Sequence, residues 1–247
     1  MAVSLKKKST SEKLITPETQ NKIPFSIIES YKNIRTNLIS VLSKIDGKVL
    51  AISSPNASEG KSTTSVNIAI TMSQLNKKTL ILDADSRRPT IHKKMKIDNS
   101  KGCMNILAGE VSVDDAIQHY NTFLDVLPAG TKVKNPSELF SSENFDNMLE
   151  ELKDRYDYII LDTPPVNPVS DALVIAQKCE AIILVIRASV TTYDSFERAY
   201  ESLKVLDVNL DGVIINGSDI RPKYYYKGKY NYYRYSNNYY GRNDRHY

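Results

Sequence analysis

Short runs of hydrophobic residues recur along the chain. The clearest are Val49–Ser53, Thr79–Asp83, Tyr158–Asp162, Ala181–Ile186 and Gly212–Asn216, and Phe123–Leu127 is a weaker sixth. The apolar side chains in these runs follow one another directly, without the polar alternation of a half-exposed strand. Such continuous runs are typical of strands that are covered on both faces of a sheet. We therefore predict five buried strands and a weaker sixth.

Segments with a helical spacing of apolar residues lie between the predicted strands. They are Lys61–Leu75, Glu143–Arg155, Ser170–Gln177 and Asp194–Leu206. The first is apolar around so much of its girth that it must pack against more than one neighbour. Strands that alternate with helices predict an α/β fold, a mostly parallel sheet with helices on both faces. Ligands bind such a sheet beyond the carboxyl ends of its strands, so polar residues there are the candidates for chemistry.

Composition changes at both ends of the chain and sets the predicted domain boundaries. Residues 1–23 are polar and rich in Lys, Ser and Thr, so we expect a flexible segment. Residues 221–247 hold ten of the 16 tyrosines but no Val, Leu, Ile, Met or Phe. They cannot bury enough apolar surface to fold alone, so we expect a disordered tyrosine-rich tail. One folded domain is predicted over residues 24–220.

The net charge of +4 belongs to the tail and not to the body. Residues 221–247 carry a net charge of +6, which leaves −2 for residues 1–220. The body therefore offers no extended basic surface, and the tail alone would bind nucleic acid weakly and in a salt-dependent way. Cys103 and Cys179 stand alone, which argues against a disulfide framework or a zinc site. No apolar stretch approaches the ~20 residues of a membrane span, so we expect a cytoplasmic protein.

A phosphate-binding loop is predicted directly after the first strand, where the chain reads SSPNASEGKST from residue 53 to residue 63. In such a loop, backbone N–H groups and the helix N-terminus converge on the phosphates, a lysine neutralises them, and a hydroxyl reaches Mg²⁺. Pro55 stands where the strict pattern has glycine, so a polar turn is the alternative. The expected nucleotide contacts are Ser58, Glu59, Gly60, Lys61, Ser62 and Thr63.

Two further strand ends carry carboxylates. The predicted strand Thr79–Asp83 ends at Asp83, with Asp85 two residues further, and the predicted strand Tyr158–Asp162 ends at Asp162. The last is placed like the carboxylate that holds Mg²⁺ in P-loop enzymes. Each Asp alone is more often a cap or a turn former. Together with the GKS sequence, the three acids predict a nucleoside triphosphate site, with Mg²⁺ held near Ser62, Asp83 and Asp162.

These motifs resemble those of the bacterial P-loop protein-tyrosine kinases, or BY-kinases, over about residues 23–247. They are most similar to the separate cytoplasmic kinase subunit of capsule and exopolysaccharide systems. The family's Walker A′ motif, Asp-x-Asp-x-Arg-x-Pro, fits Asp83, Asp85, Arg87 and Pro89, and its Walker B motif fits the third strand. The resemblance implies the architecture of deviant-Walker, MinD-like P-loop NTPases, with ATP and Mg²⁺ as cofactors.

The resemblance also implies assembly and partners. An oligomerisation helix with the pattern Glu-x-x-Arg-x-x-Arg is expected over residues 24–45, where Glu29, Lys32 and Arg35 take the three positions. Lys32 lacks the bidentate fork of an arginine at the middle position. The implied partners are further copies in a ring-like homo-oligomer, a membrane-anchored adaptor of the polysaccharide co-polymerase type and a cognate phosphotyrosine phosphatase, but no nucleic acid. The adaptor would recruit the protein to the inner face of the cell membrane.

The activity implied by the resemblance is that of an ATP-dependent, non-receptor protein-tyrosine kinase that controls polysaccharide polymerisation and export. A tyrosine hydroxyl, with a pKa of about 10, benefits from a base. Either acid of the Walker A′ motif can take the proton, and the resemblance favours Asp83. The candidate catalytic residues are thus Lys61, Asp83, Asp85 and Asp162. The expected acceptors lie in the tail: Tyr224, Tyr225, Tyr226, Tyr230, Tyr232, Tyr233, Tyr235, Tyr239 and Tyr240.

Two alternatives stay open at this stage. The first is a ParA/MinD-type partitioning or positioning ATPase with the same core fold. Loops of that class typically carry an additional early lysine, whereas this loop has none between Ser53 and Gly60. The second concerns Asn216, at the end of the last predicted strand. The resemblance lets Asn216 face the adenine, but a turn-forming asparagine is an equally good interpretation.

Overall fold

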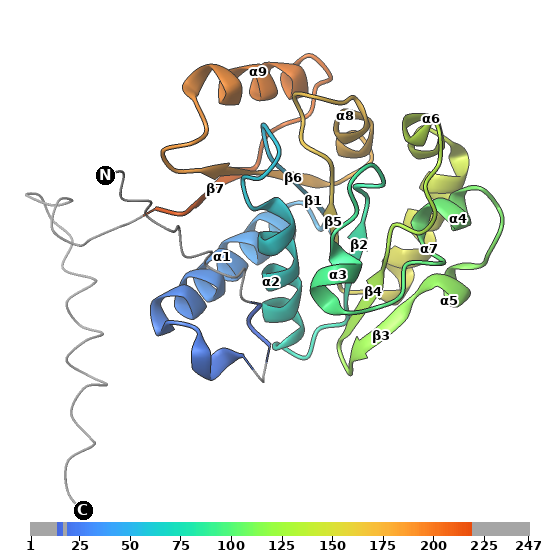
Figure 1. Cartoon of the computed structure of the whole chain (residues 1–247), viewed down its shortest axis with the longest axis horizontal. Helices are drawn as coiled ribbons and strands as arrows, with labels where there is room; N and C mark the ends of the chain where they lie inside the picture. The colour runs from blue at the N-terminus through green and yellow to red at the C-terminus, as the bar shows by residue number, and fades with distance from the viewer. Residues whose placement is uncertain (1–13, 17–18, 219–247) are drawn as a thin grey trace, which may run out of the picture. The chain divides into compact units, whose positions relative to one another are not determined.

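The computed structural model of this protein describes residues 14–16 and 19–218. A seven-stranded sheet in the order β3-β4-β2-β5-β1-β6-β7 forms its centre (Figure 1). All neighbouring strands are parallel except the antiparallel pair β3 and β4. The strands are β1 Val49–Ser53, β2 Thr79–Asp83, β3 Gln118–Asn121, β4 Leu124–Leu127, β5 Tyr158–Asp162, β6 Ala181–Arg187 and β7 Gly212–Asn216. The predicted mostly parallel sheet is confirmed.

Helices cover both faces of this sheet, as the sequence predicted. Alternate residues of β1 show the two sides: Leu50 and Ile52 pack with α1 and α2, whereas Val49 and Ala51 face the helices of the other side. The helices are η1 Gln20–Lys22, α1 Phe25–Lys44, α2 Lys61–Ser73, α3 Ile91–Met95, α4 Cys103–Leu107, α5 Val113–Ala116, α6 Pro136–Phe140, α7 Glu143–Arg155, α8 Asp171–Ala176 and α9 Tyr193–Lys204.

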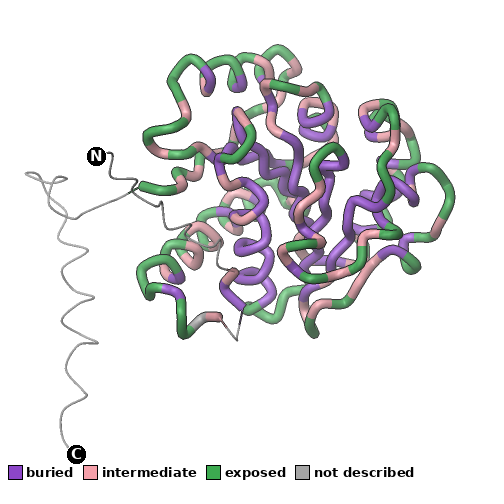
Figure 2. The backbone as a smooth tube through the Cα atoms, viewed as in Figure 1, coloured by how far each residue is buried: buried purple, intermediate pink, exposed green. Residues whose placement is uncertain are grey.

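Helix α2 is enclosed by its neighbours. All of its residues are buried except Thr63, which is half-buried. Its contacts include α1, the adjoining strands and α3, so the prediction of more than one packing partner is confirmed. Figure 2 shows this helix and the central strands as one buried body. The helix that begins at the phosphate-binding loop is therefore a rigid support for it.

The structure corrects several sequence predictions at element ends. Helix α2 stops at Ser73 and not at Leu75, because the following turn places Asn76 in the left-handed region with φ 58°. Strand β3 was not predicted, since it is a polar edge strand without a hydrophobic run. The short helices α3 to α6 were also missed, because an element of four or five residues is too short to show a helical period.

The two predicted flexible ends fall mostly or wholly outside the described residues. Residues 221–247 lie outside them entirely, so the tail stays a prediction. Part of the predicted N-terminal segment is described, and there Ile15 is fully buried and donates its N–H to Asn67 at 2.8 Å. Within the described ranges, no helix combines the length and hydropathy needed to cross a membrane.

Candidate active site

The order of the strands brings the three predicted motifs to one edge of the sheet. Strand β5 lies between β2 and β1, and the phosphate-binding loop leaves the carboxyl end of β1. In the pairing register, Asp162 of β5 stands beside Asp83 of β2 on one side and Ile52 of β1 on the other. Residues that are separated by up to about a hundred positions in the sequence therefore meet at the place where parallel sheets bind ligands.

The phosphate-binding loop, residues 54–60, has a backbone that suits an anion site. Ser58 and Gly60 both lie in the left-handed region, with φ of 66° and 100°. At Gly60 a side chain is also excluded by space, because a Cβ atom there would lie 2.0 Å from Nδ2 of Asn216. The loop ends at the N-terminus of α2, where unpaired N–H groups and the helix dipole attract phosphate. A strained non-glycine residue in such a loop is typical of a functional turn.

Lys61 lies among three buried acids. Its ammonium is 2.8 Å from Oδ2 of Asp85 and 3.7 Å from Oδ2 of Asp162. Burial by itself lowers the pKa of Lys61, but the carboxylates of Asp162 and Asp85 outweigh it and hold the pKa above its usual value. Burial, together with the neighbouring Asp162, raises the pKa of Asp83 to about 8. Burial likewise raises the pKa of Asp162. Asp83 and Asp162 are therefore harder to ionise than exposed carboxyl groups, whereas the ammonium of Lys61 is held in its charged form.

Asp83 and Asp85 organise the turn that follows β2. Oδ2 of Asp83 accepts the backbone N–H groups of Thr90 and Ile91, both at 3.0 Å, and Oδ1 accepts that of Asp85 at 3.2 Å. Oδ1 of Asp85 accepts the N–H of Arg88 at 3.0 Å, while its other oxygen binds Lys61. Asp83 thus supports the start of α3, and Asp85 is the acid of this motif that contacts the lysine.

Asp162 fits the predicted magnesium site best. Its Oδ1 accepts the hydroxyl of Ser65 at 3.1 Å, whereas its buried Oδ2 has the ammonium of Lys61 at 3.7 Å but no hydrogen bond within the described residues. A buried oxygen without a partner is rare unless a ligand or water satisfies it. The hydroxyl of Ser62 lies 3.3 Å from the ammonium of Lys61. Ser62 and Asp162 are therefore suited to hold a magnesium ion and its waters. No group of three or more His, Cys, Asp or Glu side chains in the described parts of the chain forms a metal site by itself.

Arg87 of the Walker A′ motif has a contact that the sequence did not reveal. Its Nε and Nη2 atoms donate to the two oxygens of Asp171 at 2.6 and 3.0 Å. Asp171 begins α8, is fully buried, and also accepts a hydrogen bond from the hydroxyl of Ser137 in α6. The turn after β2 is therefore clamped to the helices on one face of the sheet.

Glu59 and Asn216 were predicted to contact nucleotide, and the structure places both against protein atoms. The carboxylate of Glu59, which is 1% exposed, accepts the N–H of Asn56 at 2.9 Å and the hydroxyl of Thr191 at 2.6 Å. The side-chain amide of Asn216 donates to the carbonyl of Glu59 at 3.0 Å. A nucleotide contact for either side chain stays a prediction. Thr191 was missed because nothing in its local sequence marks it.

The other predicted residues are placed as follows. On α1, Lys32 forms an ion pair with Glu29 at 2.8 Å, and Arg35 donates to the carbonyl of Thr71 in α2 at 2.7 Å. Both contacts lie within one chain, and the oligomerisation role of these residues stays a prediction. The nine predicted acceptor tyrosines, Tyr224 to Tyr240, lie outside the described residues.

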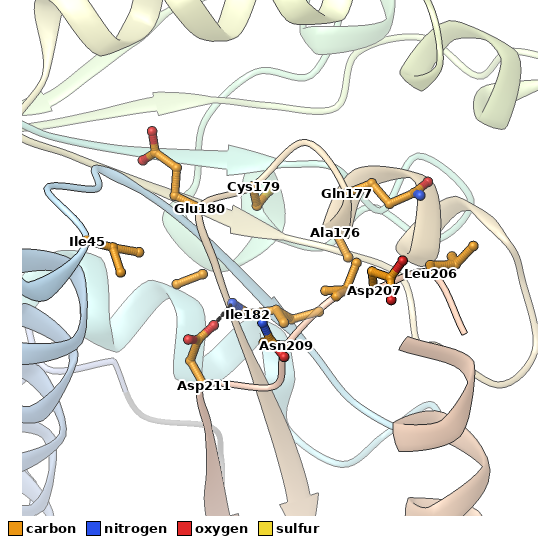
Figure 3. Close-up of a pocket in the computed structure, with 12 residues that line it drawn as sticks. Ile45, Ala176, Gln177, Cys179, Glu180, Ile182, Leu206, Asp207, Asn209 and Asp211 are labelled. Atoms are coloured by element: carbon orange, nitrogen blue, oxygen red, sulfur yellow. Dashed lines mark hydrogen bonds between the residues drawn. The ribbon is translucent and has the colours of Figure 1, made fainter. Parts of the chain in front are cut away.

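A cavity of about 380 Å³ lies at the opposite end of the sheet (Figure 3). It is bordered by Glu180 and Asp211, which precede β6 and β7. Both acids bind the beginnings of strands: Glu180 accepts the N–H of Val49 at 2.8 Å, and Asp211 accepts that of Ile182 at 2.9 Å. Their carboxylates are therefore engaged in holding the sheet, and the cavity is remote from the motif residues.

Comparison with known proteins agrees with this geometry. A family model described as an AAA domain matches residues 47–212, more than half of the chain. The putative tyrosine-protein kinase CapB of Staphylococcus aureus is 35% identical over 228 residues, which cover 91% of this chain and 99% of that protein. The chain belongs to the bacterial tyrosine-protein kinases. The predicted family and the predicted enzyme class, a non-receptor protein-tyrosine kinase, are thereby confirmed.

Solved structures of this kinase family share the fold. The kinase domain of the Escherichia coli tyrosine kinase ETK superposes with a TM-score of 0.76 at 31% identity, covering 82% of this chain and 80% of that one. The chain spans 26% of a longer relative, the tyrosine-protein kinase ptk of Acinetobacter johnsonii. The MinC:MinD complex of Aquifex aeolicus, at 22% identity and a TM-score of 0.58, shares the fold alone. The predicted MinD-like P-loop architecture is confirmed.

Proposed function

We propose that this kinase transfers the γ-phosphate of ATP, with Mg²⁺, to tyrosines of its own C-terminal tail, and that it thereby regulates capsular or extracellular polysaccharide polymerisation and export. The observation that carries the proposal is the meeting of Lys61, Asp85 and Asp162 in one buried cluster beside the phosphate-binding loop. Such a cluster supplies the positioning and charge neutralisation that phosphoryl transfer requires.

The residues act as follows in this proposal. The loop amides and the N-terminus of α2 bind the phosphates, and Lys61 leaves Asp85 to neutralise the β- and γ-phosphates. Ser62 and Asp162 would hold Mg²⁺, which would supply positive charge against the phosphates. The phenolic oxygen forms a bond to the γ-phosphorus as the bond to the bridging oxygen breaks, and Asp83 or Asp85 takes the phenolic proton. Asp83 is also a proposed metal contact.

The proposed acceptor is the tail because of its charge and chemistry. The +6 tail would be attracted to a site that contains three acids, and salt would weaken this attraction. Each phosphate adds roughly −1.5 to −2 charges, so about four of them cancel the charge of the tail. The proposed partners are further copies of the chain, with Glu29, Lys32 and Arg35 at the contact, a membrane-anchored adaptor and a phosphotyrosine phosphatase. The adaptor would hold the kinase at the inner face of the membrane.

Replacing Asp85 by asparagine should change binding and transfer in opposite directions. A neutral amide at this position cannot compete with phosphate for the ammonium of Lys61, so we expect affinity for ADP to rise by about three- to tenfold, the size typical of one exchanged ion-pair partner. Transfer to tyrosine should fall by at least about tenfold, because an acid of the site is lost. Calorimetry with ADP in the presence of a chelator measures the first effect without metal. Equal ADP affinity in wild type and variant would contradict the competition.

Replacing the nine acceptor tyrosines by phenylalanine should abolish self-phosphorylation while ATP binding persists, because the site is unchanged. The measurement is phosphotyrosine after incubation with ATP, magnesium and the cytoplasmic segment of the adaptor. A Lys61→Met chain of different length, mixed with the wild type, serves as the control, since label on that chain shows transfer between molecules. Wild-type protein that hydrolyses ATP and forms no phosphotyrosine would favour the ParA/MinD-type ATPase instead.

A further inference from the structure

The phosphate-binding loop is tied to the segment that connects β6 to α9, residues 187–195, which we call the β6–α9 turn. Glu59 forms the central link. Its Oε2 closes the loop on itself by accepting the N–H of Asn56 at 2.9 Å, and its Oε1 accepts the hydroxyl of Thr191 at 2.6 Å. The same hydroxyl accepts the N–H of Arg187 at 2.8 Å, which directs its proton to Glu59. Glu59 therefore joins the two segments through hydrogen bonds with defined directions.

Further contacts hold the loop from the same side. Arg187 donates to the carbonyl of Ser58 at 3.2 Å. The side-chain amide of Asn56 donates to the hydroxyl of Ser195 at 2.5 Å, and Asn167, which follows β5, binds the same hydroxyl at 3.0 Å. Ser58, whose φ of 66° is in the left-handed region, lies in the stretch of loop that these contacts hold. A backbone in that region persists only where its surroundings hold it.

The position of Glu59 is chemically informative. A buried carboxylate beside an anion site raises the free energy of bound phosphate through like-charge repulsion. Its 1% exposure leaves no room for a role at the protein surface. The benefit of an acid here must therefore come from the hydrogen bonds that it accepts, since charge-assisted bonds to an N–H and a hydroxyl are stronger than neutral ones.

We propose that Glu59 is a positioning residue that holds the phosphate-binding loop in its phosphate-accepting shape by bracing it, through Thr191, against the β6–α9 turn. This inference rests on the nucleotide site of the proposed function and adds a role that is separate from contact with the nucleotide. The turn then belongs to the nucleotide site, although Thr191 is 132 positions away from Glu59 in the sequence. A movement of the turn changes nucleotide affinity in this arrangement.

Four full-length variants test the brace: Glu59→Ala, Glu59→Gln, Thr191→Val and the double variant Glu59→Ala with Thr191→Val. The first measurement is the equilibrium affinity for ADP with magnesium, by calorimetry. We expect about a tenfold loss for Glu59→Ala, the size of one charge-assisted hydrogen bond, and about a threefold loss for Thr191→Val. Glu59→Gln should lose clearly less affinity than Glu59→Ala, because its carbonyl can accept the N–H of Asn56 and its amide can donate to the hydroxyl of Thr191, although both bonds are then neutral.

The double variant and the kinetics distinguish a brace from a direct contact. If Glu59 acts through Thr191, the two single variants lose ADP affinity through the same interaction. The double variant should then bind ADP no more weakly than Glu59→Ala alone. Thr191→Val should raise the KM for ATP and leave kcat within twofold, because chemistry at bound ATP is unchanged. Thermal unfolding without nucleotide provides the control for general destabilisation.

Three results would overturn the inference. They are an unchanged ADP affinity in Glu59→Ala, a loss in Glu59→Gln as large as that in Glu59→Ala, and fully additive losses in the double variant. The second would mean that the charge of Glu59 acts directly on the ligand or its metal. Failure of the proposed function is distinguishable, since the wild type would then form no phosphotyrosine, whereas the ADP affinities of the variants are measured without any transfer to tyrosine.

Discussion

Replacing Lys61 by methionine should lower the rate of tyrosine phosphorylation by at least about 10²-fold, the range found when one preorganised stabilising group is removed from an active site. Lys61 is the cation that the structure places within ion-pair distance of both Asp85 and Asp162. Methionine has a similar length, so the packing of α2 is kept while the charge is lost. Phosphotyrosine formation at saturating ATP, in the presence of the adaptor segment, measures the effect.

The same substitution should also alter the protein without nucleotide. Loss of the ammonium leaves three buried acids without their nearest cation, and these acids must take up protons or repel one another. We therefore expect a lower melting temperature at neutral pH for Lys61→Met, with a smaller deficit for a Lys61→Met, Asp85→Asn double variant. Lys61→Arg is the matched control that keeps the charge. Transfer within tenfold of wild type in Lys61→Met would contradict the role given to this residue.

Replacing Arg87 by alanine should destabilise the fold by about 2 kcal/mol, since it leaves the fully buried carboxylate of Asp171 without its cation. This value is below that of a fully buried pair, because the Arg87 side chain is 44% exposed. Asp171→Asn should lower the free energy of unfolding by less than Arg87→Ala does, because a neutral amide can keep the hydrogen bond from Ser137. Urea unfolding at pH 7 measures both changes. Equal stability of wild type and Arg87→Ala would contradict the clamp.

The effect of Arg87 should depend on pH in a defined direction. Burial raises the pKa of Asp171, but hydrogen bonds from Arg87 and Ser137 outweigh it and hold the pKa below its usual value. A carboxyl group with a lowered pKa stabilises the fold above its unfolded pKa of about 3.9 and loses that contribution as the pH falls through the folded pKa. The stability difference between wild type and Arg87→Ala should therefore narrow below about pH 4. A constant difference from pH 7 to pH 3 would contradict the ion pair.

Much of the fold could be predicted from the sequence because its central strands are covered on both sides. Such strands must be apolar throughout, and three of them, β1, β2 and β5, have the predicted bounds. Strand β7 also has the predicted bounds, but the prediction that it is buried was wrong, because it is an edge strand in which Val213 and Ile215 are 40% and 58% exposed. Strand β3 could not be found, since an edge strand with polar residues has no such signature. The short helices around α4 and α6 are set by tertiary packing, as the fully buried ring of Phe140 illustrates.

The candidate site was predictable where chemistry is concentrated in short motifs. Asp83 and Asp162 end hydrophobic runs, and Lys61 follows the loop after another such run, so their meeting at one sheet edge follows from parallel topology. The partners that hold these motifs were not predictable. Asp171 and Thr191 lie far along the chain from the residues that they bind, and pairing over such distances leaves no local pattern.

The burial of α2 has a consequence for how the enzyme can be controlled. Apart from the half-buried Thr63, every residue of the helix that carries a hydroxyl group is buried: Ser62, Thr64, Ser65, Thr71 and Ser73. Another kinase cannot reach them, and a phosphate group has no space there. A covalent modification that changes nucleotide binding is therefore expected in the segments that flank this helix and not at its buried hydroxyl groups.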